Sequence, residues 1–261
     1  MSGPRDPAAR TATGVRVQAE VTGHAAPAPA TLLEESWRDY IFAEIWSRPG
    51  LDRRSRYAIA MAGAAGAGDA AACETYVRGA LACAALTLAE LREAALHLAV
   101  YAGWSAGGIL DQAATRAAGA LGLPAAARPP IRAEPWDPAV RHEEGAASFQ
   151  AHMLFGGPPP RTAYFEGGIL NFVFGEMWSR PGLDERTRRW LTLVGVGLSS
   201  ATIPIRSHVW SAMASGNASA TEMEEFVLQY AVHAGWPRGS VMQGAVLEQA
   251  ARVAEGLPFE A

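Results

Sequence analysis

The long segments of this chain carry the residue pattern of helices. Alanine, leucine, glutamate and arginine dominate these segments, and apolar positions are interspersed with polar ones. The strict alternation of valine, isoleucine and threonine that is typical of strands is nearly absent. The pattern therefore predicts an all-α protein.

Capping signals divide these segments into individual helices. Asp52 follows a Pro-Gly turn and is a plausible N-cap, and Thr87 with Glu90 forms a capping-box pattern. Gly103 is a natural helix stop. In the first half we expect one helix to end at Trp46, and further helices over 52–66, 69–84, 87–103 and 105–121. In the second half we expect helices over 166–178, 184–199, 203–215, 220–234 and 238–254.

An internal repeat organises the chain. Residues 42–56 and 174–188 are identical at eleven of fifteen positions, with an offset of 132. The same offset relates Thr87-x-x-Glu90 to Ser219-x-x-Glu222, and residues 98–105 to 230–237. A period of this length is too long for a solenoid. We interpret the repeat as a gene duplication and expect the two halves to pack as a pseudo-dimer.

The repeat and the composition together suggest four segments. Residues 1–30 are rich in Ala, Pro, Gly and Thr, and we expect a disordered tail there, because such a segment buries little apolar surface. The first repeat is expected at 31–121 and the second at 164–261. Between them, the proline-rich segment 122–163 is expected to be a linker and connecting segment.

Charge and cysteine content exclude several function classes. The net charge is −4, so the chain lacks the basic surface that bulk nucleic-acid binding requires. No apolar run approaches the length of a spanning helix, and the N-terminus has no apolar core typical of a secretory signal. We therefore expect no membrane partner and a cytoplasmic protein. Two cysteines cannot make a disulfide framework or a Cys-rich zinc site.

The repeated motifs resemble a known family. The motif E-(I/M)-W-S-R-P-G-L-D-x-R-x-R, followed later by (Y/H)-A-G-W, is similar to the carboxymuconolactone decarboxylase family over residues 32–121 and 164–256. The resemblance implies the all-helical AhpD-like fold and assembly into rings or trimers of dimers. With two repeats in one chain, a homo-oligomer is expected, and a trimer of this chain is favoured.

The superfamily has a thiol-peroxidase branch and a decarboxylase branch. The peroxidase-linked branch carries a C-x-x-C pair, which this sequence lacks, and we interpret Cys73 and Cys83 as packing residues. The histidine of the decarboxylase branch falls on His208 in the second half and on Tyr76 in the first. The later motif adds His233 and Tyr101 in the same order. The second half, with two histidines, is therefore expected to hold the working site.

The resemblance implies a decarboxylation in which the substrate is its own electron sink, so no cofactor and no metal are expected. Such a reaction needs a donor to the developing oxyanion, an acid or base, and a cation that holds the carboxylate. The candidate catalytic residues are His208, Glu176 and His233. The candidate substrate-binding residues are Arg188, Arg206, Trp178, Trp236 and Trp210.

Structural roles compete with several of these assignments. Glu176 recurs as Glu44, which suits a shared structural hydrogen bond equally well, and His233 suits the C-terminus of a helix. The tryptophans suit a core. Three functions stay open: a cofactor-independent decarboxylase of a lactone or related small carboxylic acid, a repurposed isomerase, cyclase or lyase of a specialised-metabolite pathway on the same scaffold, and a non-catalytic binding protein.

Overall fold

The computed structural model describes residues 6–260, and these residues form helices and no strand. The prediction of an all-helical protein is confirmed. The first half contains α1 (Pro7–Thr22), α2 (Leu32–Ser36), η1 (Trp37–Trp46), α3 (Arg53–Gly66), α4 (Ala70–Ala82), α5 (Leu88–Ala102) and α6 (Trp104–Ala120). The second half contains α7 (Pro138–Met153), η2 (Tyr164–Met177), α8 (Glu185–Ser199), α9 (Thr202–Ala214), α10 (Ala220–Ala234) and α11 (Trp236–Ala254).

Side-chain caps start helices α3, α5 and α10 where the sequence predicted them. The carboxylate of Asp52 accepts from the backbone N–H of Ser55 at 2.9 Å, which caps α3. Thr87 and Glu90 make both bonds of a capping box at the start of α5, and Ser219 with Glu222 repeats it at α10. Gly103 follows α5 at a φ of 89°, in the conformation that favours glycine.

The repeated Glu-x-Trp motif lies at the ends of two π-helices, with Trp46 the last residue of η1 and Trp178 the C-cap of η2. In η2, the Trp178 N–H donates to the Val173 carbonyl at 3.0 Å, which is the five-residue step of this helix type. π-helical turns are rare and occur frequently at functional sites. The sequence predicted helices here but gave no sign of this wider winding.

The expected disordered tail is wrong for most of its length. Residues 7–22 form α1, capped by Asp6, with Val17 and Val21 fully buried. The helix packs on η1, and a Cβ at Gly14 would collide with the carbonyl of Arg38. Two buried valines and one close backbone contact thus hold this helix against η1. The overall composition of the segment gave no indication of it. Residues 1–5 of the expected tail lie outside the described residues.

The segment between the halves contains a helix that the sequence analysis did not assign. Residues 123–137 lack regular structure, as expected, but α7 follows and packs on η2. It matches α1 at an offset of 131, because Asp137 caps it as Asp6 caps α1, and Gly145 approaches the Leu170 carbonyl. The repeat therefore extends to this helix. The weak match between α1 and α7 in sequence hid it.

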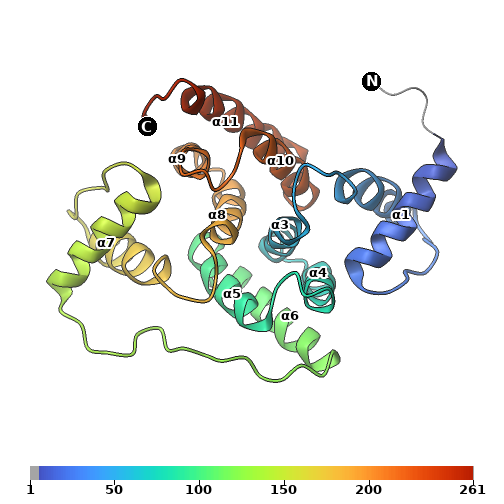
Figure 1. The fold of residues 1–261 in the computed structure, drawn as a ribbon, viewed down its shortest axis with the longest axis horizontal. Helices are drawn as coiled ribbons and strands as arrows, with labels where there is room; N and C mark the ends of the chain where they lie inside the picture. Colours follow the sequence, from blue (N-terminus) through green and yellow to red (C-terminus); the bar gives the residue numbers. More distant parts are fainter. Residues whose placement is uncertain (1–5, 261) are drawn as a thin grey trace.

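Helices of the two halves interlock at the centre of the molecule. Figure 1 shows α3 and α8 in the middle, with α1 at one end and α7 at the other. Helix α3 packs against α8 and α10, and α8 packs against α5. Each half therefore places one of its helices, α5 or α10, against the other half. This arrangement is consistent with the pseudo-dimer that the repeat predicts.

Matched ion pairs cross between the halves. Glu225 on α10 accepts from Arg48 at 2.7 Å and from the fully buried Arg56 at 2.9 Å. At the offset of 132, Glu93 on α5 accepts from Arg180 at 2.6 Å and 2.7 Å. Both carboxylates are buried, so each charge depends on its partner from the other half. No helix among the described residues is long and apolar enough to cross a membrane.

We expect the Glu225→Gln variant to be strongly destabilised. The substitution leaves the guanidinium of Arg56 buried without its carboxylate, and breaking such a pair typically costs about 3–5 kcal/mol. Chemical denaturation monitored by circular dichroism measures the loss. The matched control is Asp111→Asn, which removes an exposed pair with Arg92 and should cost less than about 1 kcal/mol. Equal losses in the two variants would contradict this account.

Candidate functional site

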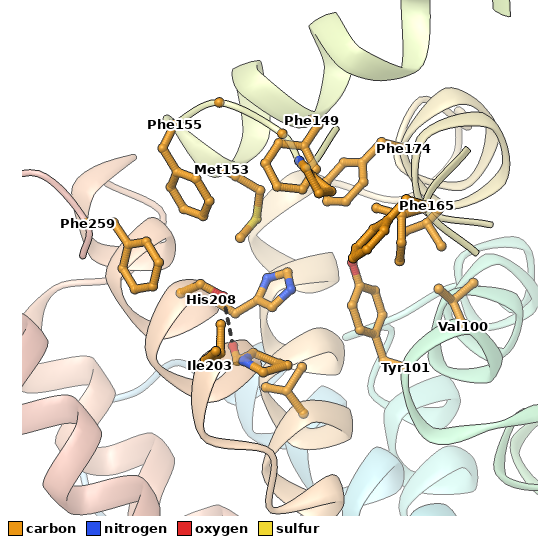
Figure 2. Close-up of a pocket in the computed structure, with 18 of the residues that line it drawn as sticks. Val100, Tyr101, Phe149, Met153, Phe155, Phe165, Phe174, Ile203, His208 and Phe259 are labelled. Carbon is orange, nitrogen blue, oxygen red and sulfur yellow. Dashed lines mark hydrogen bonds between the residues drawn. The ribbon is translucent and has the colours of Figure 1, made fainter. Parts of the chain in front are cut away.

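A cavity of about 640 Å³ opens beside α9 in the second half. Its lining is mostly apolar, and its polar side chains are Tyr101, Tyr164, Ser199, Ser207 and His208. No Asp, Glu, Lys or Arg is among the described residues that line it. Figure 2 shows phenylalanines above and to the sides of the cavity, with His208 and Tyr101 reaching into it from below. The other lining residues are Val100, Phe149, Met153, Phe155, Gly156, Gly157, Pro158, Phe165, Ile169, Val173, Phe174, Val196, Ile203, Pro204 and Phe259.

His208 stands on the buried face of α9, with only 8% of its surface exposed. Its Nδ1 atom is buried and has no hydrogen-bond partner among the described residues. Burial, and then the charge of Arg189, lower the pKa of the imidazole to about 3. His208 is therefore a neutral base with an unused ring nitrogen at the cavity wall.

Tyr101 comes from α5 in the first half and meets His208 edge to face, with ring centroids 5.4 Å apart. Its hydroxyl oxygen accepts from Trp178 Nε1 at 2.6 Å. Burial raises the pKa of this phenol to about 12, against the opposing effect of the Trp178 hydrogen bond and of nearby arginine charges. The phenol is therefore protonated, and its own hydrogen is available to donate.

His97 supports Tyr101 from behind. Its Nδ1 lies 3.4 Å from Arg188, which can only donate, so Nδ1 is the acceptor. The other nitrogen, Nε2, then carries the proton and donates to Thr192 at 2.9 Å. Burial holds the pKa of His97 well below its usual range. Both nitrogens are thus engaged, and the ring of His97 lies 5.3 Å from that of Tyr101 between centroids.

Arg189 is a buried cation next to this cluster. It is 1% exposed, and its guanidinium lies 4.7 Å from the Trp178 ring centroid. One nitrogen donates to the His152 carbonyl and, at 3.1 Å, to Glu185. Its Nε and Nη1 atoms are buried without partners among the described residues. Arg189 is the charge that acts on His208 and Tyr101, although it does not line the cavity.

The structure places the predicted catalytic residues in three different surroundings. His208 lines the cavity. Glu176 does not, because it is paired with Arg132 at 3.1 Å and Arg141 at 2.9 Å, as Glu44 is with Arg10. His233 lies in a separate cluster, beside Trp37 and Tyr76 of the first half. The expectation that His208 and His233 share one site is wrong, because α5 and α10 are exchanged between the halves.

The predicted substrate-binding residues are also dispersed, and none of them lines the cavity. Arg188 donates to the carbonyls of Met177 and Arg180, and Arg206 is paired with Glu248 at 2.5 Å. Trp178 lies behind Tyr101, and Trp210 packs against Phe155 and Phe259 from outside the cavity. Trp236 is 52% exposed, beside Tyr40.

A matched cluster in the first half is filled with aromatic rings. His233 from α10 meets Tyr76 and Trp37 at ring centroid distances of 5.6 Å each, and Trp46 stacks on Tyr76. At the offset of 132, Trp37 corresponds to Ile169, Tyr76 to His208 and Tyr57 to Arg189. Larger rings thus stand where the second half has an isoleucine and a histidine. The two matched places have diverged into one hollow site and one packed site.

Sequence reasoning missed Tyr101, Arg189 and His97 as members of the hollow site. Tyr101 was recognised as the counterpart of His233, but it was expected to belong to a site in the first half. The available signal for Arg189 was its replacement of Tyr57, a charged group at an aromatic position of the repeat. Of the cysteines, Cys73 is buried as expected, but Cys83 is exposed, so its interpretation as a packing residue is wrong. The described residues contain no group of three or more potential metal ligands.

The fold and the cavity define an all-helical protein with a buried histidine–tyrosine pair. Comparison with known proteins gives its relationship. Residues 32–108 match the model of the carboxymuconolactone decarboxylase family. The 4-carboxymuconolactone decarboxylase of Acinetobacter baylyi is 32% identical over 73 residues, which are 28% of this chain and 54% of that relative. The chain thus spans about half the length of the curated relative it matches.

These matches confirm the family resemblance for residues 32–108 and relate that segment at family level to decarboxylases. The matched segment contains Tyr101 but not His208, which lies in the second half. The identity of the chemistry at the cavity therefore rests on the geometry of the cavity, to which both halves contribute.

The neutral state of His208 can be tested by its effect on stability. The pKa of His208 is lowered in the folded protein, so the unfolded chain takes up a proton at higher pH than the folded one. The free energy of unfolding should therefore fall as the pH drops below the ordinary histidine value of 6.5. The His208→Phe variant should lose stability less steeply over the same range. In the wild-type protein, the nitrogen-15 NMR signal of His208 should remain that of a neutral ring at about pH 5. A protonated ring at that pH would contradict the assignment.

Proposed function

We propose that the chain is a cofactor-independent, decarboxylase-like enzyme that acts on a lactone or related small carboxylic acid by acid/base chemistry. The observation that carries this proposal is the meeting of Tyr101 and His208 at one wall of an apolar cavity. The family relationship supports the same reaction class.

Its place at the cavity wall suits Tyr101 to the role of oxyanion donor. When the bond between carbon and carboxylate breaks, its electrons move into a conjugated carbonyl of the substrate and CO₂ leaves. The phenol of Tyr101 then donates a hydrogen bond to the developing negative oxygen. Trp178 donates to Tyr101, while burial keeps the pKa of the phenol high. The phenol therefore stays protonated and keeps its hydrogen available for this bond.

His208 is suited to carry the proton that completes the reaction. The carbon that loses CO₂ must gain a proton, and the source of that proton is solvent. A neutral imidazole can release a proton from one nitrogen while the other nitrogen takes one up. The partnerless Nδ1 of His208 leaves one nitrogen available for this exchange. The low pKa of His208 makes such a relay more suitable than a permanent imidazolium acid.

The apolar lining favours a second candidate function. A decarboxylase of this type needs a cation to hold the carboxylate, and the described lining residues include none. An isomerase or cyclase of a specialised metabolite needs the same oxyanion donor and proton relay, but no carboxylate clamp. Tyr101 and His208 would serve that reaction in the same roles.

The decisive experiment measures CO₂ release from two acids whose own carbonyl accepts the electrons, γ-carboxymuconolactone and 2-naphthoylacetate. The wild-type protein should accelerate release from at least one of them. Tyr101→Phe and His208→Phe should each lower that rate by about 10²–10⁴-fold, the range for loss of an oxyanion donor or a general acid/base.

The matched control is His233→Phe, since His233 is the counterpart of Tyr101 in the packed cluster and should leave the rate unchanged. Without turnover of either acid by the folded protein, the decarboxylase proposal fails and the isomerase or cyclase is favoured. If His208→Phe and Tyr101→Phe retain full turnover, the site assignment is wrong.

A further inference from the structure

The residues that line the cavity indicate the chemical class of its ligand more narrowly than the reaction class does. We propose that the cavity beside His208 takes a largely apolar, aromatic substrate with no more than one carboxylate, in place of a small dicarboxylate. This proposal rests on the proposed function for the identity of the reacting end, but its argument comes from the rest of the cavity.

Aromatic and thioether side chains from several elements form the wall opposite the reacting pair. Phe149 and Met153 come from α7, and Phe174 comes from η2. Phe155 and Phe259 stack on each other at 4.8 Å between ring centroids. Figure 2 shows these rings facing the same space as His208. Such a wall offers dispersion contacts and ring stacking, which a flat aromatic ligand satisfies.

Few polar side chains of the lining are open to a ligand. Ser207 and Ser199 are already engaged, because their hydroxyls donate to the carbonyls of Pro204 at 3.2 Å and Val196 at 2.7 Å. Tyr164 also lines the cavity but is 67% exposed. Tyr101 and His208 remain to bind the reacting end of the ligand. A second carboxylate would have to lie against phenylalanine rings, and an unpaired buried carboxylate is strongly disfavoured.

One negative charge on the ligand is compatible with the cavity, because a cation lies near the reacting end. Arg189 lies behind Trp178, and two of its nitrogens are buried without partners among the described residues. Its positive charge reaches His208 and Tyr101. A single carboxylate placed at that end is therefore stabilised by this charge.

The internal repeat provides a comparison for the aromatic wall. Phe149, Met153 and Phe155 correspond, at the offset of 131, to Gln18, Thr22 and His24 in the first half. The two helices hold matched positions, against η1 and η2. The apolar character of this wall is therefore a property of the hollow site and is not imposed by the fold.

The cavity size agrees with this ligand class. Ligand pockets commonly enclose about 300–1,000 Å³, and the cavity of about 640 Å³ accommodates a fused two-ring or three-ring molecule. A five-membered lactone with two carboxylates would leave much of the aromatic surface uncovered.

Titration calorimetry with two probes tests the proposal directly. The neutral aromatic probe is 2-acetylnaphthalene, the product of 2-naphthoylacetate decarboxylation, and the dianionic probe is cis,cis-muconate. We expect the naphthyl ketone to bind at least about tenfold more tightly than muconate. Equal binding, or tighter binding of muconate, would overturn the proposal.

The repeat also supplies the variant that locates the binding. Ile169→Trp introduces the residue that fills the matched position in the first half, where Trp37 contacts His233. It should weaken binding of the naphthyl ketone by at least about tenfold. The control Val241→Trp places the same ring on an exposed position of α11, outside the cavity lining, and should change nothing.

If Ile169→Trp does not fold, as judged by circular dichroism, Phe155→Asp provides the second variant. It places a carboxylate in the aromatic wall and should weaken the naphthyl ketone to a similar degree. Unchanged affinity in the folded variants would show that the ketone binds elsewhere, and the proposal would fail.

The turnover measurements keep this proposal separate from the proposed function. Binding of the naphthyl ketone without CO₂ release from 2-naphthoylacetate or the lactone supports the substrate class and rejects the decarboxylase. Efficient, His208-dependent turnover of γ-carboxymuconolactone with tight binding of muconate supports the decarboxylase and rejects the apolar substrate class.

Discussion

Two buried carboxylates, Glu225 and Glu93, determine how the halves of this protein meet. Each lies on a helix of one half and is held by arginines of the other half. A buried carboxylate without its arginine is strongly unfavourable, so these helices must dock across the centre of the molecule. Docking of α5 then places Tyr101 beside His208, and docking of α10 places His233 beside Tyr76. Neither cluster can be assembled from one half alone.

Within that shared framework, a few side chains make the two clusters different. Trp37 and Tyr76 fill the cluster around His233, whereas Ile169 and His208, at the matched positions, leave a cavity beside Tyr101. Arg189 adds a cation to the open site at the position where Tyr57 stands in the packed one. The backbone arrangement that positions a donor and a base is thus common to both, while the space for a ligand and the local charge depend on individual residues.

The sequence predicted the helices well because their start signals are local. Asp52, Thr87 and Ser219 cap helices through bonds to residues three positions away, and such patterns are visible in one short window. Helices α1 and α7 also begin at an Asp-Pro pair, at residues 6–7 and 137–138, but few large apolar residues follow, and the composition concealed them. Each is held by packing on η1 or η2, which no local window contains. The capping and periodicity rules also gave no means of recognising a π-helix.

The site could be predicted only in part for the same reason. The resemblance pointed to His208, which lines the cavity, and its catalytic role stays a prediction. Glu176 and Arg188 were equally reasonable candidates from the sequence. In the structure, Glu176 is paired with Arg141, and Arg188 donates to the backbone carbonyls of Met177 and Arg180, so neither is available to a ligand. Which half supplies each side chain depends on the docking of α5 and α10, and a repeat alone does not specify whether its two copies exchange helices.

The exchange of α5 and α10 has a consequence for how such a protein can change over generations. In an assembly of two identical chains, one substitution alters both sites together, so a gain in one is repeated in the other. In this chain, α5 of the first half enters the open cluster and α10 of the second half enters the packed one, so a substitution alters a single site. The open cluster and the packed cluster can therefore evolve independently. One can acquire new chemistry while the other keeps its role in the packing of the two halves.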